Sequence, residues 1–339
     1  MRRRSLLLAA LPAGLVTLAG CGDDKSDSGK ASGSPSPSAS SVPPPKIVDG
    51  PLPTVTDGTK FGEKPKVAKG TGEPSKNLAV KTLIAGSGRT VAENEFIQAH
   101  YLGQIWDTGH VFDNSYDRKR PLLLQLAQGT IIDGWRYALT GKKTGSRIEI
   151  AVPPKWGYGE SGEPRAGIKG TDTLVFVIDL IDSFNSKSSA KGKPVAQKVA
   201  QGEHALPTVD TNTDGKLPKV TVDKKAAPPR KLTSVYVLEG DGEEVKADQT
   251  LLCQFQCVVW ESGKTYRQTY GSGRLSEIAL QQMQQTVKGL AQGLTGKKVG
   301  SRVLVVVPPE LGYGDNPPSG GVVKKDSTLV FTVDILAAM

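Results

Sequence analysis

Residue types that commonly carry out covalent or metal chemistry are rare in this chain of 339 residues, which has three histidines and three cysteines. The histidines are His100, His110 and His204, and no spacing between them and the cysteines resembles that of a metal site. We therefore expect no bound metal. Any activity has to come from other residue types.

Two of the cysteines, Cys253 and Cys257, lie in an alternating run typical of a strand, four residues apart on one face. At about 3.3 Å per residue their Cα atoms are about 13 Å apart, beyond the reach of a disulfide. We expect both to be small buried hydrophobic side chains.

Most of the chain consists of two similar halves. The run Leu52–Val55 recurs as Leu206–Val209, and Leu139–Arg147 recurs as Leu294–Arg302 at nearly the same interval. This period is far longer than the roughly 20 to 50 residues of solenoids and propellers, so each copy is expected to be a whole domain. Shared positions account for the fold, so differences between the copies report on function.

The first 21 residues are expected to be an export signal. Arg2 to Arg4 form a charged start, Ser5 to Thr17 is mostly apolar, and small residues precede Cys21. The run Leu18–Cys21 resembles the lipobox of bacterial lipoproteins, whose cysteine becomes lipidated. We therefore expect a lipid anchor at Cys21 and a place on the extracytoplasmic face of the bacterial membrane. The alternative is an ordinary cleaved signal with an incidental cysteine.

Composition divides the rest of the chain. Residues 22–51 are rich in Ser, Pro and Gly without apolar periodicity, which predicts a disordered tether. Residues 52–184 then form the first domain, 185–204 a polar linker, and 205–339 the second domain.

The formal net charge is +9, and the basic residues are mixed with acidic ones along the sequence. Nucleic-acid binding requires a clustered basic face with stacking aromatic residues, and the sequence shows neither. We expect no nucleic-acid partner.

Short strands punctuated by Gly and Pro dominate each half, and in the first they are expected at 95–103, 147–152 and 173–181. One helix stands out between them. Thr130 and Asp133 have the form of a capping box, Ile131, Trp135 and Leu139 form an apolar stripe, and Gly141 ends the segment. The pattern predicts an α+β fold in which an antiparallel sheet curves around one short helix.

Five motifs in the first copy resemble, in order and spacing, the FK506-binding-protein (FKBP) family of peptidyl-prolyl isomerases. They are His100–Gly103, Val111–Ser115, Ile131–Trp135, Gly157–Gly159 and Thr173–Phe176. Taken singly, such aromatic residues are more often part of a core than of a ligand site. The joint match favours a pocket.

The resemblance implies a substrate site with Trp135 as its floor. Its walls would be Tyr101, Phe112, Ile131, Ile132 and Phe176, with Tyr158 at the rim and Leu122 and Ile168 also touching substrate. Asp113 would face inward and pair with Arg118 and the Tyr101 hydroxyl, because a buried carboxylate is costly without partners. The alternative for Asp113 is a turn residue at a strand end.

This resemblance also implies the activity, which is isomerisation of Xaa-Pro bonds without a nucleophile, metal or cofactor. The partners would be proline-containing segments of unfolded or exported proteins, and macrolide inhibitors of the family would bind the same pocket.

The second copy lacks the three polar side chains that are expected to interact in the first. Its counterparts of Tyr101, Asp113 and Arg118 are Phe255, Arg267 and Ser272, while Tyr266 and Leu290 replace Phe112 and Trp135. We expect a folded second domain with weak or no activity; the alternative is a slower enzyme.

For the whole chain, the leading hypothesis is an anchored prolyl isomerase of exported proteins. The alternative is a surface interaction or chaperone module whose catalysis is incidental, and a structural lipoprotein suits the second domain better than the first.

Overall fold

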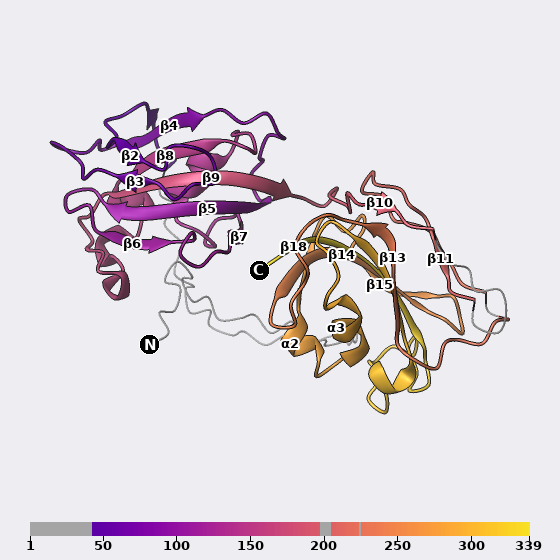
Figure 1. Cartoon of the computed structure of the whole chain (residues 1–339). Helices are drawn as coiled ribbons and strands as arrows, with labels where there is room; N and C mark the ends of the chain where they lie inside the picture. The colour runs from indigo at the N-terminus through magenta and orange to yellow at the C-terminus, as the bar shows by residue number, and fades with distance from the viewer. Residues whose placement is uncertain (1–42, 197–204, 224) are drawn as a thin grey trace, which may run out of the picture. The chain divides into compact units, whose positions relative to one another are not determined.

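A computed structural model describes residues 43–196, 205–223 and 225–339. They form two compact units, one ending at Ser183 and the other running from Phe184 to Met339 (Figure 1). The expected export signal, Cys21 and residues 22–42 of the expected tether lie outside the described residues. Across the described ranges, no helix combines the length and apolar character needed to cross a membrane.

A seven-stranded sheet with the order β1-β4-β8-β9-β5-β6, in which β7 also pairs with β5, forms the first unit. Its strands are β1 (Ile47–Val48), β4 (Leu78–Ile84), β5 (Phe96–Ile105), β6 (Val111–Asn114), β7 (Leu122–Gln125), β8 (Arg147–Val152) and β9 (Leu174–Phe184). A hairpin of β2 (Val55–Asp57) and β3 (Lys66–Val67) precedes β4. The expected strands correspond to β5, β8 and β9.

The helix of the first unit, α1 (Asp133–Leu139), is shorter than the apolar stripe that predicts it. The capping-box prediction is wrong: the N-cap is Ile132, and the Thr130 hydroxyl instead donates to the carbonyl oxygens of Gln125 and Ala127. Asp133 pairs with Arg136 one turn later at 3.0 Å. Trp135 and Leu139 are buried as the stripe predicts.

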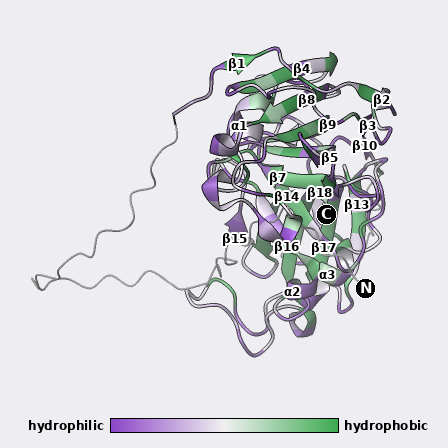
Figure 2. Cartoon of the chain, turned by 90° about the vertical axis from the view of Figure 1, so that its left-hand side faces the viewer, coloured by the Kyte–Doolittle hydropathy of each residue, from purple (hydrophilic) through white to green (hydrophobic). Residues whose placement is uncertain are grey.

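Both faces of the sheet are covered at strand β8, since all six of its residues are buried. Ile148 and Ile150 join the core against α1, whereas Ala151 packs on the other face with Trp106 and Val175. Alternate residues of a strand point to opposite faces, so this sheet is covered by α1 on one side and by the N-terminal segment on the other. Figure 2 shows the resulting concentration of hydrophobic residues in the strands.

A fully buried ion pair fastens the N-terminal segment to the sheet. Arg147 and Asp179, both 0% exposed, pair at 2.6 Å across β8 and β9. Arg147 also donates to the carbonyl oxygens of Gly58 and Glu63, and Asp179 accepts the Gly62 N–H at 2.7 Å. Because each charged group is hydrogen-bonded, the pair is retained in the interior and fixes the loop between β2 and β3.

The second unit repeats this architecture in the order β10-β13-β17-β18-β14-β15, with β16 paired to β14. Its strands are β10 (Lys193–Pro194), β13 (Thr233–Glu239), β14 (Thr250–Val259), β15 (Thr265–Gln268), β16 (Ser276–Ala279), β17 (Arg302–Val307) and β18 (Leu329–Ala338). Its helices are α2 (Leu280–Met283) and α3 (Lys288–Leu294). The hairpin is β11 (Thr208–Val209) with β12 (Val220–Thr221), and Arg302 pairs with Asp334 as Arg147 does with Asp179.

Two segments outside the expected domains belong to a sheet. Ile47–Val48, placed by composition in the tether, pairs with β4, and Lys193–Pro194, placed in the linker, pairs with β13. Ser189 and Ala190 are also buried, and the Ala190 N–H donates to Asp334 at 3.1 Å. Backbone hydrogen bonds hold these short pieces, and such pairing leaves little trace in composition.

Cys253 and Cys257 are both buried and form no disulfide, which confirms their interpretation as small interior side chains.

Candidate functional site

Four aromatic side chains of the first unit form a continuous edge-to-face series. The Trp135 ring lies 5.4 Å from Tyr101 and 5.4 Å from Phe176, and Phe176 lies 5.7 Å from Phe112, measured between ring centroids. Such T-shaped arrangements are the preferred aromatic geometry. The residues come from β5, β6, α1 and β9, so the fold brings together side chains that are far apart in sequence.

Burial is graded along this series. Tyr101, Trp135 and Phe176 are fully buried, whereas Phe112 is partly exposed. The Trp135 Nε1–H has no hydrogen-bond partner within the described residues. A buried donor without a partner is costly and is rare in folded proteins. The geometry therefore gives the aromatic cluster a buried base and an accessible edge.

A polar network joins this cluster on one side, as the family resemblance implies. The Tyr101 hydroxyl donates to Asp113 Oδ2 at 2.5 Å and accepts from Arg118 at 2.7 Å, and Arg118 forms an ion pair with Asp113. The Asp113 side chain is only 8% exposed. Burial, followed by the Asp113 carboxylate, raises the pKa of Tyr101 far above its ordinary value, so the phenol stays protonated and donates.

The remaining expected site residues also lie around the aromatic cluster. Ile168 is buried in the same core, and the others are half-buried against it: Leu122, Ile131, Ile132 and Tyr158. Burial raises the pKa of Tyr158 to about 12, with smaller contributions from Glu163 and Asp113. As the N-cap, Ile132 precedes the helical hydrogen bonds, so its N–H has no partner within the helix.

Within the described residues, no group of His, Cys, Asp and Glu side chains is arranged to hold a metal ion. The cluster offers instead a hydrophobic aromatic surface with hydrogen-bonding groups at its edge. Such a surface suits recognition of a small apolar ring beside a polar main chain.

Comparison with known proteins assigns the family. Residues 87–181 and 241–336 each match FKBP-type peptidyl-prolyl cis-trans isomerases. The chain belongs to this family.

Several individual proteins are similar to this chain. An FK506-binding protein from Streptomyces anulatus is 38% identical over 119 residues, which cover 35% of this chain and 96% of that protein. Peptidyl-prolyl cis-trans isomerase FKBP9 from Homo sapiens is 31% identical over 272 residues, which cover 78% of this chain but only 38% of FKBP9. The crystal structure of FkpA from Escherichia coli is 35% identical, covers 34% of this chain and 52% of that one, and gives a TM-score of 0.29.

These comparisons confirm three predictions from the sequence: the FKBP family, the α+β fold in two repeats, and isomerase activity of the FKBP type. The roles assigned to individual residues stay predictions.

Sequence reasoning missed Gly103, which controls the space around the aromatic rings. Gly103 lies on β5 opposite Asp113, and a Cβ at this position would lie 2.7 Å from the Phe112 ring and 2.8 Å from the Phe176 ring. These distances are too short for any side chain, so both rings depend on this glycine. Its signal was available in the sequence, because the second copy has Cys257 there.

The corresponding region of the second FKBP domain has different contents. Cys257 lies on β14 opposite Arg267 in the same register, and its side chain is buried. Leu290 stands in the place of Trp135. The ring centroids of Tyr266 and Tyr313 lie 6.1 Å apart, and the Arg267 guanidinium lies over the Tyr266 ring, 5.4 Å from its centroid. Ser272 donates to the carbonyl of Thr269 within its own turn. The aromatic series and the buried carboxylate are therefore both replaced.

Proposed function

We propose that the N-terminal FKBP domain is a prolyl isomerase of exported proteins, held at the extracytoplasmic face of a bacterial membrane by a lipid on Cys21. The observation that carries the catalytic part is the aromatic cluster with its Tyr101–Asp113–Arg118 network, which the second domain lacks. The leader sequence supports the anchor, and an exported chain meets exported substrates.

The chemistry follows from the electronic structure of the amide. An Xaa-Pro bond rotates over a barrier of about 18 to 20 kcal/mol because the C–N bond has partial double-bond character. Twisting breaks the conjugation and leaves a less dipolar amide. A dry aromatic pocket favours this twisted state over the planar state, which water solvates well. Each 1.36 kcal/mol of the difference raises the rate about tenfold.

In this proposal each part of the site has a task. Phe112, Trp135 and Phe176 enclose the proline ring, while the Ile132 N–H and the Tyr158 hydroxyl hold carbonyl oxygens of the peptide. Tyr158 is suited to this because its raised pKa of about 12 keeps the phenol protonated across the physiological range. The polar network orients Tyr101 and the start of the loop that carries Arg118. Macrolide inhibitors would occupy the same surface.

The second domain is proposed to be a binding or spacing module with little activity. Cys257 places a side chain at the position where Gly103 has none, and Arg267 brings a positive charge to the place of Asp113. These two changes favour, for this half alone, the alternative of a surface interaction module.

Paired substitutions in the full chain test the catalytic proposal. Phe112→Ala should lower kcat/KM for a short Xaa-Pro peptide at least tenfold, equal to about 1.4 kcal/mol of transition-state stabilisation. Tyr266→Ala, at the matching position of the second domain, should leave the rate unchanged. Comparable losses from both variants would show that both domains are active and would contradict the proposal.

Cellular fractionation tests the anchor. The parent chain should sediment with membranes, and Cys21→Ala should release it or leave it with an uncleaved leader. Equal membrane association of the two chains, with a cleaved N-terminus in both, would argue for an ordinary signal peptide.

A further inference from the structure

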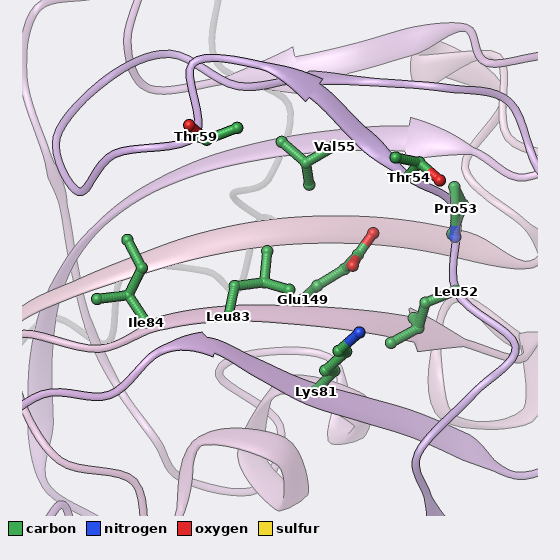
Figure 3. A pocket seen from close by; sticks show the side chains of 9 residues that line it. All are labelled: Leu52, Pro53, Thr54, Val55, Thr59, Lys81, Leu83, Ile84 and Glu149. Atoms are coloured by element: carbon green, nitrogen blue, oxygen red, sulfur yellow. The ribbon is translucent and has the colours of Figure 1, made fainter.

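The first FKBP domain holds a cavity on the face of the sheet opposite the aromatic cluster. Its volume is about 360 Å³, and it lies between β4, β8 and the segment leading into the first hairpin (Figure 3). It is lined by Leu52, Pro53, Thr54, Val55, Thr59, Lys81, Leu83, Ile84 and Glu149. Ile148 and Ile150 of β8 pack in the same core as the aromatic cluster. Glu149 lies between them in sequence, so its side chain points to the opposite face of the sheet.

Glu149 is the unusual member of this lining. The residue is only 2% exposed, and its Oε1 atom has no hydrogen-bond partner within the described residues. Burial raises its pKa to about 7, while the Lys81 charge acts in the opposite direction. A buried carboxylate without a full set of partners is costly, and such groups concentrate at functional sites.

Lys81 faces the same cavity from the neighbouring strand. It lies directly opposite Glu149 in the register of β4 and β8, and its side chain is exposed. Figure 3 shows the Glu149 carboxylate directed into the space beneath segment 52–59 and the Lys81 amine directed toward that carboxylate. Among the described residues no ion pair joins the two groups within 4.0 Å. The Glu149 carboxylate and the Lys81 amine are thus both available to hydrogen-bond a ligand.

The second FKBP domain shows that the fold does not require these charges. Leu304 and Val235 occupy the matching positions of β17 and β13, again directly opposite each other. They pack with Val209, Val237 and Val306 in an apolar cluster under the second hairpin. The same architecture is therefore built with an entirely apolar pair, so Glu149 and Lys81 need another explanation than folding.

We propose that this cavity binds a small zwitterion with an apolar side chain, of the α-amino-acid class. The ligand ammonium would donate to the buried Glu149 carboxylate, and the ligand carboxylate would meet the Lys81 amine at the open side. Leu52, Val55 and Ile84 would receive the apolar side chain. A volume of about 360 Å³ falls in the range of small-molecule pockets, which is about 300 to 1,000 Å³.

Charge pairing selects this ligand class over simpler ones. A plain amine would satisfy Glu149 but would bring a second positive charge next to Lys81. A plain carboxylate would satisfy Lys81 but would approach the Glu149 carboxylate. A zwitterion places each of its groups beside the opposite charge, which is the arrangement that electrostatic complementarity favours.

Titration of the full chain with L-leucine, followed by ligand-observed NMR, tests the proposal. We expect saturable binding, with isoamylamine and isocaproate, which each lack one charged group, at least tenfold weaker. Glu149→Gln and Lys81→Met should each weaken L-leucine binding at least tenfold. The matched control is Glu277→Gln, which removes an exposed carboxylate of the second domain and should leave binding unchanged.

A second variant guards against loss of structure. Glu149→Leu combined with Lys81→Val copies the pair of the second domain and should fold, keep the prolyl isomerase rate and bind no L-leucine. Absence of L-leucine binding to the parent up to its solubility limit would overturn the proposal. Binding that survives Glu149→Gln, or that Glu277→Gln weakens equally, would also overturn it, and neither result bears on the isomerase assignment.

Discussion

The two FKBP domains differ at matching positions of strands β5 and β14. Gly103 lets the Phe112 and Phe176 rings approach the backbone of β5, whereas Cys257 places a side chain at the same point of β14. The framework around them is common to both, including the buried pairs Arg147–Asp179 and Arg302–Asp334. The second domain thus keeps the architecture of the first, although the volume and charge of the region around the aromatic cluster differ. This comparison distinguishes the residues needed for folding from those proposed for catalysis.

The strongest way to break this comparison is to give the first domain the residue of the second. Gly103→Cys should push the Phe112 and Phe176 rings apart and lower kcat/KM about 100-fold, equal to about 2.7 kcal/mol. It should also destabilise the domain by about 1 to 3 kcal/mol, as overpacking does. Peptide isomerisation and chemical denaturation of the full chain measure the two effects.

The reverse change, Cys257→Gly, is its control and should not create activity, because Leu290 and Arg267 remain. A full rate in Gly103→Cys would show that the two rings do not define the site.

A second prediction concerns the opposite face of the sheet. Folding raises the pKa of Glu149 from 4.5 to about 7, so between these values the folded chain holds a proton that the unfolded chain has lost. Stability therefore falls as pH rises through this window and is constant above it. Glu149→Leu removes this dependence, so its stability relative to the parent should increase by about 3 kcal/mol between pH 4 and pH 8.

Denaturant unfolding at several pH values, followed by NMR signals of the first domain, measures the difference. A constant offset between the two chains from pH 4 to 8 would contradict the raised pKa. Leu304→Glu should introduce the same pH dependence into the second domain.

The polar network offers a smaller effect. Arg118→Ser, which copies Ser272, should destabilise the first domain by about 1 kcal/mol, since Asp113 keeps only the Tyr101 hydroxyl. The cost is moderate because the Arg118 side chain is 31% exposed and water replaces part of the interaction. Isomerase activity should fall severalfold. Ser272→Arg, with no buried carboxylate to meet, should stay within about 0.5 kcal/mol of the parent.

The smallest expected effect sharpens the comparison of the helices. Helix α3 begins at Lys288, where a positive charge is unfavourable, whereas α1 begins at Asp133. Lys288→Asp should stabilise the second domain by about 0.5 kcal/mol at low salt, and the gain should decrease with added salt. A gain that is independent of salt would point to a cause other than the helix dipole.

Much of this molecule could be predicted from the sequence because repeated motifs report long-range structure. The strands at 147–152 and the Tyr101–Asp113–Arg118 network follow the expectations closely. The start of α1 differs from the prediction, because the Thr130 hydroxyl donates to the carbonyl of Gln125 in the preceding turn instead of capping the helix. A Thr side chain can form either bond, and the sequence does not show which of the two the backbone geometry allows.

Other features depend on contacts that no local pattern records. Lys193–Pro194 carries no apolar signal and pairs with β13. The cavity at Glu149 also escaped prediction, because an acidic residue inside a short apolar strand does not reveal which face it occupies or what covers it.

The two buried thiols of the second domain have a practical consequence. Burial raises the pKa of Cys253 and of Cys257 well above the ordinary value, and the thiolate is the form that attacks alkylating reagents. From residue 22 onward the chain has no other cysteine. In a chain whose Cys21 carries no free thiol, the rate of iodoacetamide labelling therefore reports the opening of the second domain alone and measures its local unfolding without any engineered probe.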